Sequence, residues 1–114
     1  MGISDAPRQL LIFAPDSAAS KVHITRRRID GSRDQSEERD LLVRYLLGAR
    51  EEAAEARARW SVDSGESVAL LIGRDGGVKL RTGLPVDTDK IFALIDTMPM
   101  RRREMAEKLS ESDR

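Results

Sequence analysis

The chain of 114 residues contains no cysteine, one histidine and no net charge, and each absence removes a class of function. Without cysteine the chain can form no disulfide, no thiolate nucleophile and no cysteine-ligated metal site. His23 alone cannot form a multi-histidine metal site, so we expect neither a metal nor a cofactor. The 20 basic and 20 acidic residues cancel, so binding of nucleic acid or an anionic membrane would need a local patch.

Aromatic residues and long apolar runs are also scarce. Aromatics make up 4% of the chain and apolar residues 39%, so the core must consist mainly of Leu, Ile, Val and Ala. No apolar run approaches the roughly 20 residues that cross a bilayer. Residues 10–14 are too short for the apolar part of a signal peptide and lack a basic start. We therefore expect a cytoplasmic protein that does not bind membranes, with export still possible if the N-terminus was trimmed.

Residues 67–83, SVALLIGRDGGVKLRTG, predict two strands joined by a tight turn. An uncharged apolar run over residues 68–72 is typical of a strand buried on both faces. Asp75-Gly76-Gly77 then supplies residues that tolerate the positive φ angles of a hairpin turn. Residues 78–81 alternate apolar and charged, as expected for an outer strand with one wet face.

The remaining elements follow from apolar periodicity, caps and breakers. Further strands are predicted at 9–14 and 41–47, the second in the interior of the sheet because it is apolar on both faces. Helices are predicted at 17–30, with Asp16 or Ser17 as cap, and at 49–60, at 88–97 with Asp87 as cap, and at 100–109. A polar loop with at most a short helical turn is predicted at 31–40.

This β-α-β-α-β-β-α order predicts an α/β fold with a four-stranded mixed sheet and helices on both faces. Strands that alternate with helices imply parallel βαβ units, to which the hairpin adds an antiparallel edge strand. We expect a single domain over residues 1–114, with its core at about 8–109 and loose termini at 1–7 and 110–114.

Several strings resemble known families. FAPDSAASK, residues 13–21, resembles the thioredoxin stretch in which a CxxC motif opens the first helix, with Ser17 and Ser20 at the two cysteine positions. The chain more specifically resembles the bacterial DUF4174 family, which is thioredoxin-like and has no settled activity. That resemblance lies in LLIFAP (10–15), ARARW (56–60), ALLIGRDGGVKLR (69–81) and FALIDTMPMRRREM (92–105). It implies a thioredoxin-like fold, but fold alone does not carry the chemistry across.

The resemblance defines a candidate groove formed by Ser17, Ser20, Lys21, Ser67 and Val68. Thioredoxin-like proteins place a cis-proline before the third strand, where this chain has Ser67 and Val68, so both halves of the redox site are missing. The serines at a helix start favour an extended peptide or a small anion. Simple helix capping explains them as well, and we weigh capping about three to one over a groove.

Two arginine triplets form a candidate basic patch if they are adjacent in space. Solvated or internally paired side chains are favoured about four to one, because the chain has no net charge. Nucleic-acid binding is therefore not expected. The triplets are Arg26, Arg27 and Arg28, and Arg101, Arg102 and Arg103.

Three methionines, Met98, Met100 and Met105, could form an adaptable patch for a partner, although core packing is favoured about two to one. The turn explains Asp75, and His23 is expected on a helix surface. The oligomeric state is left open, because Lys79 and Arg81 on the fourth strand are charges that block edge-to-edge pairing.

The leading hypothesis is a non-catalytic thioredoxin-like module that binds a protein or peptide. One alternative is an enzyme of unknown type that uses Ser17 or Ser20 with Lys21, although serine is a poor nucleophile without an adjacent base. Another is weak binding of nucleic acid or other anions through the arginine triplets, which would weaken steeply with salt.

Overall fold

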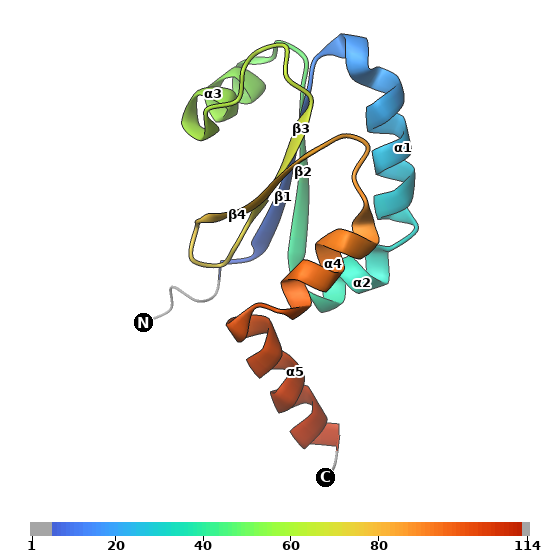
Figure 1. Cartoon of the computed structure of the whole chain (residues 1–114), viewed down its shortest axis with the longest axis vertical. Helices are drawn as coiled ribbons and strands as arrows, with labels where there is room; N and C mark the ends of the chain where they lie inside the picture. The colour runs from blue at the N-terminus through green and yellow to red at the C-terminus, as the bar shows by residue number, and fades with distance from the viewer. Residues whose placement is uncertain (1–5, 113–114) are drawn as a thin grey trace.

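The computed structural model describes residues 6–112, and in this part of the chain strands alternate with helices around one sheet (Figure 1). The strands are β1 (Arg8–Ala14), β2 (Leu41–Leu47), β3 (Val68–Ile72) and β4 (Val78–Gly83). The helices are the short 3-10 helix η2 (Asp16–Ala18), α1 (Ala19–Asp30), α2 (Arg33–Glu38), α3 (Glu51–Trp60), α4 (Thr88–Asp96) and α5 (Pro99–Ser112). Residues 1–5 of the predicted loose segment 1–7, and residues 113–114 of the predicted loose tail, lie outside the described part.

The sheet has four strands in the order β2-β1-β3-β4, and this confirms the predicted α/β fold with a mixed sheet. β1 pairs in parallel with β2, whereas β3 runs antiparallel to both β1 and β4. The prediction that β3 is parallel was wrong, because the chain enters β3 at the end of the sheet where β2 has just finished. Phe13 of β1 pairs there with both Leu46 of β2 and Val68 of β3.

β2 lies at an edge of the sheet, so the prediction of an interior strand was also wrong. Leu46 is buried and Leu42 is exposed, whereas the other apolar side chains of β2 are partly buried. Residues on both faces of β2 pack against helices. This explains why alternate residues on both faces are apolar, although one side of the strand has no neighbouring strand among residues 6–112.

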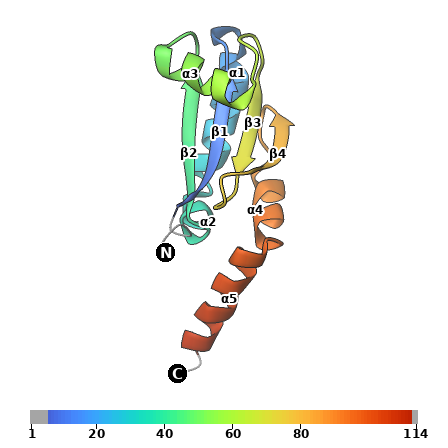
Figure 2. The same ribbon diagram turned by 90° about the vertical axis from the view of Figure 1, so that its left-hand side faces the viewer.

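Successive residues of β1 point into two separate cores, because side chains alternate along a strand. Leu10 and Ile12 join the core under α1 and α4. Leu11 and Phe13 join the core under α3. Helices therefore cover both faces, as predicted, and Figure 2 shows α3 on the opposite side of the sheet from α1.

The predicted hairpin is present. Gly76 has φ of 83°, a value that an L side chain would strain. The N–H of Gly73 donates to the carbonyl of Gly77 at 2.9 Å, and Asp75 accepts from the N–H of Gly77. The pairing of β3 with β4 is irregular between Leu71 and Ile72.

The helix at residues 88–96 also follows its prediction. Asp87 caps α4 by accepting from the N–H of Lys90 at 3.2 Å, and Ile91, Phe92 and Ile95 are buried. Pro99 opens α5, which extends away from the sheet and remains helical to Ser112, past the start of the predicted loose tail at 110 (Figures 1 and 2).

The first helical segment differs in detail from its prediction. Pro15 precedes η2 and Ala18 precedes α1, and no side chain among residues 6–112 caps either helix start. Capping by Asp16 or Ser17 was therefore wrong. The predicted loop at 31–40 contains α2, whose Ser36 is buried.

Candidate binding site

The candidate groove begins where the chain leaves β1. Ser17 lies in η2, and Ser20 and Lys21 lie in the first turn of α1, all three exposed. Ser67 and Val68 reach the same end of the sheet, because Val68 pairs with Phe13. Val68 itself is buried in the core under α3. The five residues thus share one end of the sheet, but Val68 faces the core.

A small cavity of about 290 Å³ lies at this end, and other residues form it. Its lining is Pro15, Asp16, Gly48, Ala49, Ala54, Arg57 and Ser64. Buried Arg57 donates to the carbonyl of Asp63 at 2.6 Å and lies 5.8 Å from the ring centre of Phe13. Its Nη2 is closed to solvent and has no hydrogen-bond partner among residues 6–112. The groove of Ser17, Ser20, Lys21, Ser67 and Val68 remains a prediction.

Half of the predicted basic patch is engaged within the protein. The Arg26 guanidinium lies 4.2 Å from the ring centre of Tyr45, and Arg28 donates to the carbonyl of Val86 at 2.9 Å. Arg101 is only 3% exposed. The other three members, Arg27, Arg102 and Arg103, are exposed.

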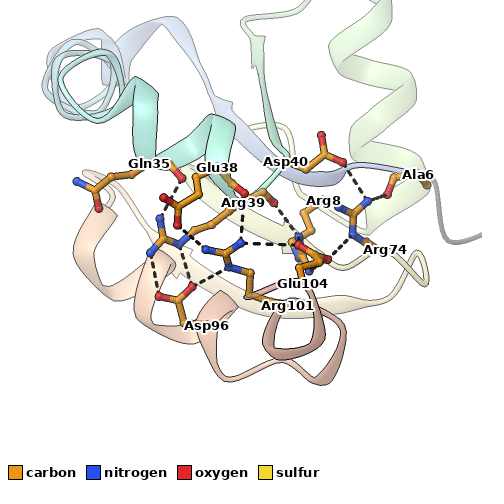
Figure 3. A network of polar contacts seen from close by, with 10 residues as sticks. All are labelled: Ala6, Arg8, Gln35, Glu38, Arg39, Asp40, Arg74, Asp96, Arg101 and Glu104. Atoms are coloured by element: carbon orange, nitrogen blue, oxygen red, sulfur yellow. Dashed lines mark hydrogen bonds and ion pairs between the residues drawn. The ribbon is translucent and has the colours of Figure 1, made fainter. Parts of the chain in front are cut away.

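The most extensive polar cluster lies at the opposite end of the sheet (Figure 3). Its centre is Arg8, the first residue of β1, whose side chain is 1% exposed. Arg8 donates to the carbonyl of Arg39 at 2.7 Å and to both carboxylate oxygens of Glu104, at 3.3 and 2.9 Å. A buried cation needs such partners, because desolvation without them is costly.

Asp96, the last residue of α4, receives two arginines. Arg39 donates to both of its oxygens, at 3.0 and 2.8 Å, and Arg101 donates at 3.2 Å. Arg101 also bonds the carboxylate of Glu38 in α2 at 2.5 Å. Hydrogen bonds from Arg39, opposed by burial and aided by Arg101, hold the pKa of Asp96 below its ordinary value.

Arg74 extends the cluster to the turn between β3 and β4. It pairs with Asp40 at 3.0 Å and with Glu104 at 3.2 Å, and it donates to the carbonyl of Ala6 at 2.7 Å. Burial opposes ionisation of Glu104, but Arg8 and Arg74 outweigh it, so the pKa of Glu104 is lowered.

We call this cluster the arginine–carboxylate network. It consists of Arg8, Glu38, Arg39, Asp40, Arg74, Asp96, Arg101 and Glu104 (Figure 3). Its members come from β1, α2, the α2–β2 connection, the β3–β4 turn, α4 and α5. The network therefore sets the position of the first turns of α5 relative to the sheet.

A cavity of about 470 Å³ lies beside the network, between the β3–β4 turn and the junction of α4 with α5. We call it the junction cavity. Its lining is Arg8, Gly73, Arg74, Asp75, Lys79, Thr97, Met98, Pro99 and Met100. The strings DGGVKLR and MPMRRREM, far apart in the sequence, thus meet at one place.

The walls of the junction cavity differ in character. Met98 also packs against the core under α1 and α4, as the core interpretation of the methionines predicted. Met100 is partly exposed, whereas Met105 lies further along α5 and is not part of the lining. On the opposite wall Lys79 pairs with Asp75 at 2.8 Å, and this bond, together with the N–H of Gly77, lowers the pKa of Asp75.

Sequence reasoning missed most of the network. Arg8 opens β1, Arg39 precedes β2 and Arg74 follows β3, so each lies beside an apolar strand. Each of these arginines lies at or beside a strand terminus, and these termini meet at one end of the sheet. Charged residues in such positions are the sequence signal that could have identified the cluster.

Residues 6–112 contain neither a metal-binding cluster nor a helix able to span a membrane. Residues 6–112 hold no group of three or more His, Cys, Asp or Glu side chains placed to bind a metal ion. Within the same range, no helix has the length and apolar character needed to cross a bilayer.

Comparison with protein families decides the assignment that the sequence strings suggested. The model of the domain of unknown function DUF4174 matches residues 3–104. The chain belongs to the DUF4174 family. No curated protein and no solved structure matches it.

The DUF4174 match ends within α5, at a residue of the arginine–carboxylate network. It ends at Glu104, the α5 residue that binds Arg8 and Arg74. The matched region thus contains the whole arginine–carboxylate network and every lining residue of the junction cavity.

Proposed function

We propose that this DUF4174 domain is a non-catalytic, thioredoxin-like binding module that holds an apolar side chain of a partner protein in the junction cavity. One observation carries the proposal. Met98, Pro99 and Met100 present an apolar wall to a cavity whose lining also includes Arg8 and Arg74, and both of these arginines are held by Glu104 of the network.

The size and chemistry of the cavity support this function. Ligand pockets typically measure about 300–1,000 Å³ and combine apolar walls with a few polar groups. Methionine side chains adapt their shape to a partner, which suits recognition of a protein segment. Lys79 and Asp75 at the turn could bond the backbone of that segment.

The alternatives have weaker support. Among residues 6–112, Ser17 and Ser20 have no hydrogen-bonded base, which a serine nucleophile requires. The anion-binding alternative loses Arg101 as a contact, because its guanidinium is buried among Asp96 and Glu38.

Selection of displayed peptides tests the proposal. Random 12-residue peptides on phage are selected on the immobilised chain, and enriched peptides are measured against Met100→Lys and Met105→Lys. Both replace a partly buried methionine of α5, but only Met100 lines the cavity. We expect at least tenfold weaker binding for Met100→Lys and unchanged binding for Met105→Lys, with circular dichroism melts showing that both fold. Failure to enrich any peptide, or equal binding by both variants, would overturn the proposal.

A further inference from the structure

Along the outer edge of β2, backbone hydrogen-bonding groups have no partner in the described part of the chain. At the two ends of the strand, Asp40 accepts from Arg8 and Gly48 donates to Ala14, both toward β1. In a parallel pair, alternate residues direct their N–H and C=O to the same neighbour. The even-numbered residues of β2 therefore face β1, and the odd-numbered residues face outward. Among residues 6–112 no hydrogen bond reaches the outward groups, which belong to Leu41, Val43, Tyr45 and Leu47.

The two edges of the sheet are defended differently. β4 carries Lys79 and Arg81 and an irregular pairing with β3, features that discourage addition of another strand. β2 carries one charge, Arg44, and its Leu42 is 49% exposed. An edge of this length and apolar character is a template for pairing unless something covers it.

We propose that β2 pairs with β2 of a second copy of this chain, antiparallel about a two-fold axis at Arg44, to form a continuous eight-stranded sheet. An antiparallel pair places outward-facing residues directly opposite one another. With the axis at Arg44, Val43 lies opposite the partner's Tyr45, and Leu41 lies opposite the partner's Leu47. This register uses all the outward backbone groups of both strands.

The side chains of β2 complement themselves in this register. On the face toward α1, each Val43 meets the partner's Tyr45, an aromatic and β-branched combination that stabilises paired strands. On the other face, Leu42 meets the partner's Leu46. α3 packs over Leu46 and leaves Leu42 half exposed. The two-fold axis brings the covered end of one strand beside the bare end of the other.

Charge also favours a second copy as the occupant. Each Arg44 would lie opposite the partner's Arg44, a repulsive arrangement by itself. Arg44 already bonds Glu52 of α3 at 2.5 Å, and the side chain of Glu52 is 71% exposed. The two pairs would form a neutral group of four charges. Two copies also do not repel each other overall, because the chain has no net charge.

Sedimentation equilibrium of the full chain tests the proposal, with Leu42→Lys and Val78→Lys as a matched pair. Both residues are about half exposed, at 49% and 48%, and they lie on opposite edges of the sheet. We expect a dimer for the parent chain and for Val78→Lys. The dimer dissociation constant of Leu42→Lys should be at least tenfold higher than that of the parent. A monomeric parent at millimolar concentration, or equal association of both variants, would overturn it.

A charge exchange tests the register and guards against misfolding of Leu42→Lys. Arg44→Glu gathers four carboxylates at the axis and should give monomers, and adding Glu52→Arg should restore the dimer. A dimeric Arg44→Glu variant would contradict the proposed axis. Met100→Lys, which tests the junction cavity, should remain dimeric, so this inference and the proposed function can fail separately.

Discussion

Polar residues are exposed at one end of the sheet and buried in ion pairs at the other. Where β1 and β2 end, Ser17, Ser20 and Lys21 are exposed, and within the described residues no side chain caps η2 or α1. Where β1 begins, buried Arg8 and Arg101 bind carboxylates from α2, α4 and α5. The resemblance to thioredoxin predicts a site at the first end, whereas the arginine–carboxylate network lies at the second. If the second end stabilises the fold, substitutions there should lower the free energy of unfolding more than substitutions at the first end.

Removal of Arg8 should have the largest effect. Arg8→Ala takes away a buried cation and leaves both the Arg39 carbonyl and Glu104 with fewer donors. We expect a loss of about 3 kcal/mol in the free energy of unfolding, the lower end of the range for a broken buried ion pair, since Arg74 still binds Glu104. Urea denaturation measures it.

The matched substitution at the other end should cost little. Ser17→Ala removes an exposed hydroxyl, and exposed substitutions usually change stability by no more than about 0.5 kcal/mol. If Ser17→Ala destabilised the chain as much as Arg8→Ala, the contrast between the two ends would not hold.

Arg101 and Arg102 sharpen the comparison within one helix. Arg101→Ala removes donors to Asp96 and Glu38, although Asp96 keeps Arg39, so we expect a loss of about 2 kcal/mol. Arg102→Ala changes an exposed neighbour and should stay within about 0.5 kcal/mol of the parent. Thermal melts that move equally for both variants would show that Arg101 contributes no more than a surface charge.

Among the effects expected of the network itself, the loss of stability in acid is the smallest. The pKa values of Asp96 and Glu104 are lowered in the folded chain. Their contribution is therefore present above the unfolded pKa values, about 3.9 and 4.3, and is lost as pH falls through the lower folded values. Urea midpoints should decrease from about pH 5 toward pH 3, and less steeply in Asp96→Asn. An equal slope in that variant would remove Asp96 from the explanation.

Local signals predicted much of the fold. The Asp-Gly-Gly turn, the Asp87 cap and the apolar face of α4 depend on residues close in sequence, and all three are present. The edge position of β2 depends instead on where distant strands lie, and an apolar run on both faces does not by itself distinguish an edge strand from an interior one.

The network could not be predicted in the same way. Arg8 and Glu104 are separated by almost the whole domain, and each alone resembles a solvated charge. Arg101 was interpreted with its two neighbours as one basic triplet, because nothing in RRR distinguishes the arginine that turns inward. The meeting of DGGVKLR with MPMRRREM at one cavity likewise required the fold.

The most direct test of the central claim is an amide chemical-shift map of the ¹⁵N-labelled chain during titration with a peptide selected from the phage library. We expect the largest shifts at residues 73–79 and 97–101, on the two sides of the junction cavity. Largest shifts at Ser17, Ser20, Lys21, Ser67 and Val68 would contradict it and place binding at the end of the sheet where thioredoxin acts.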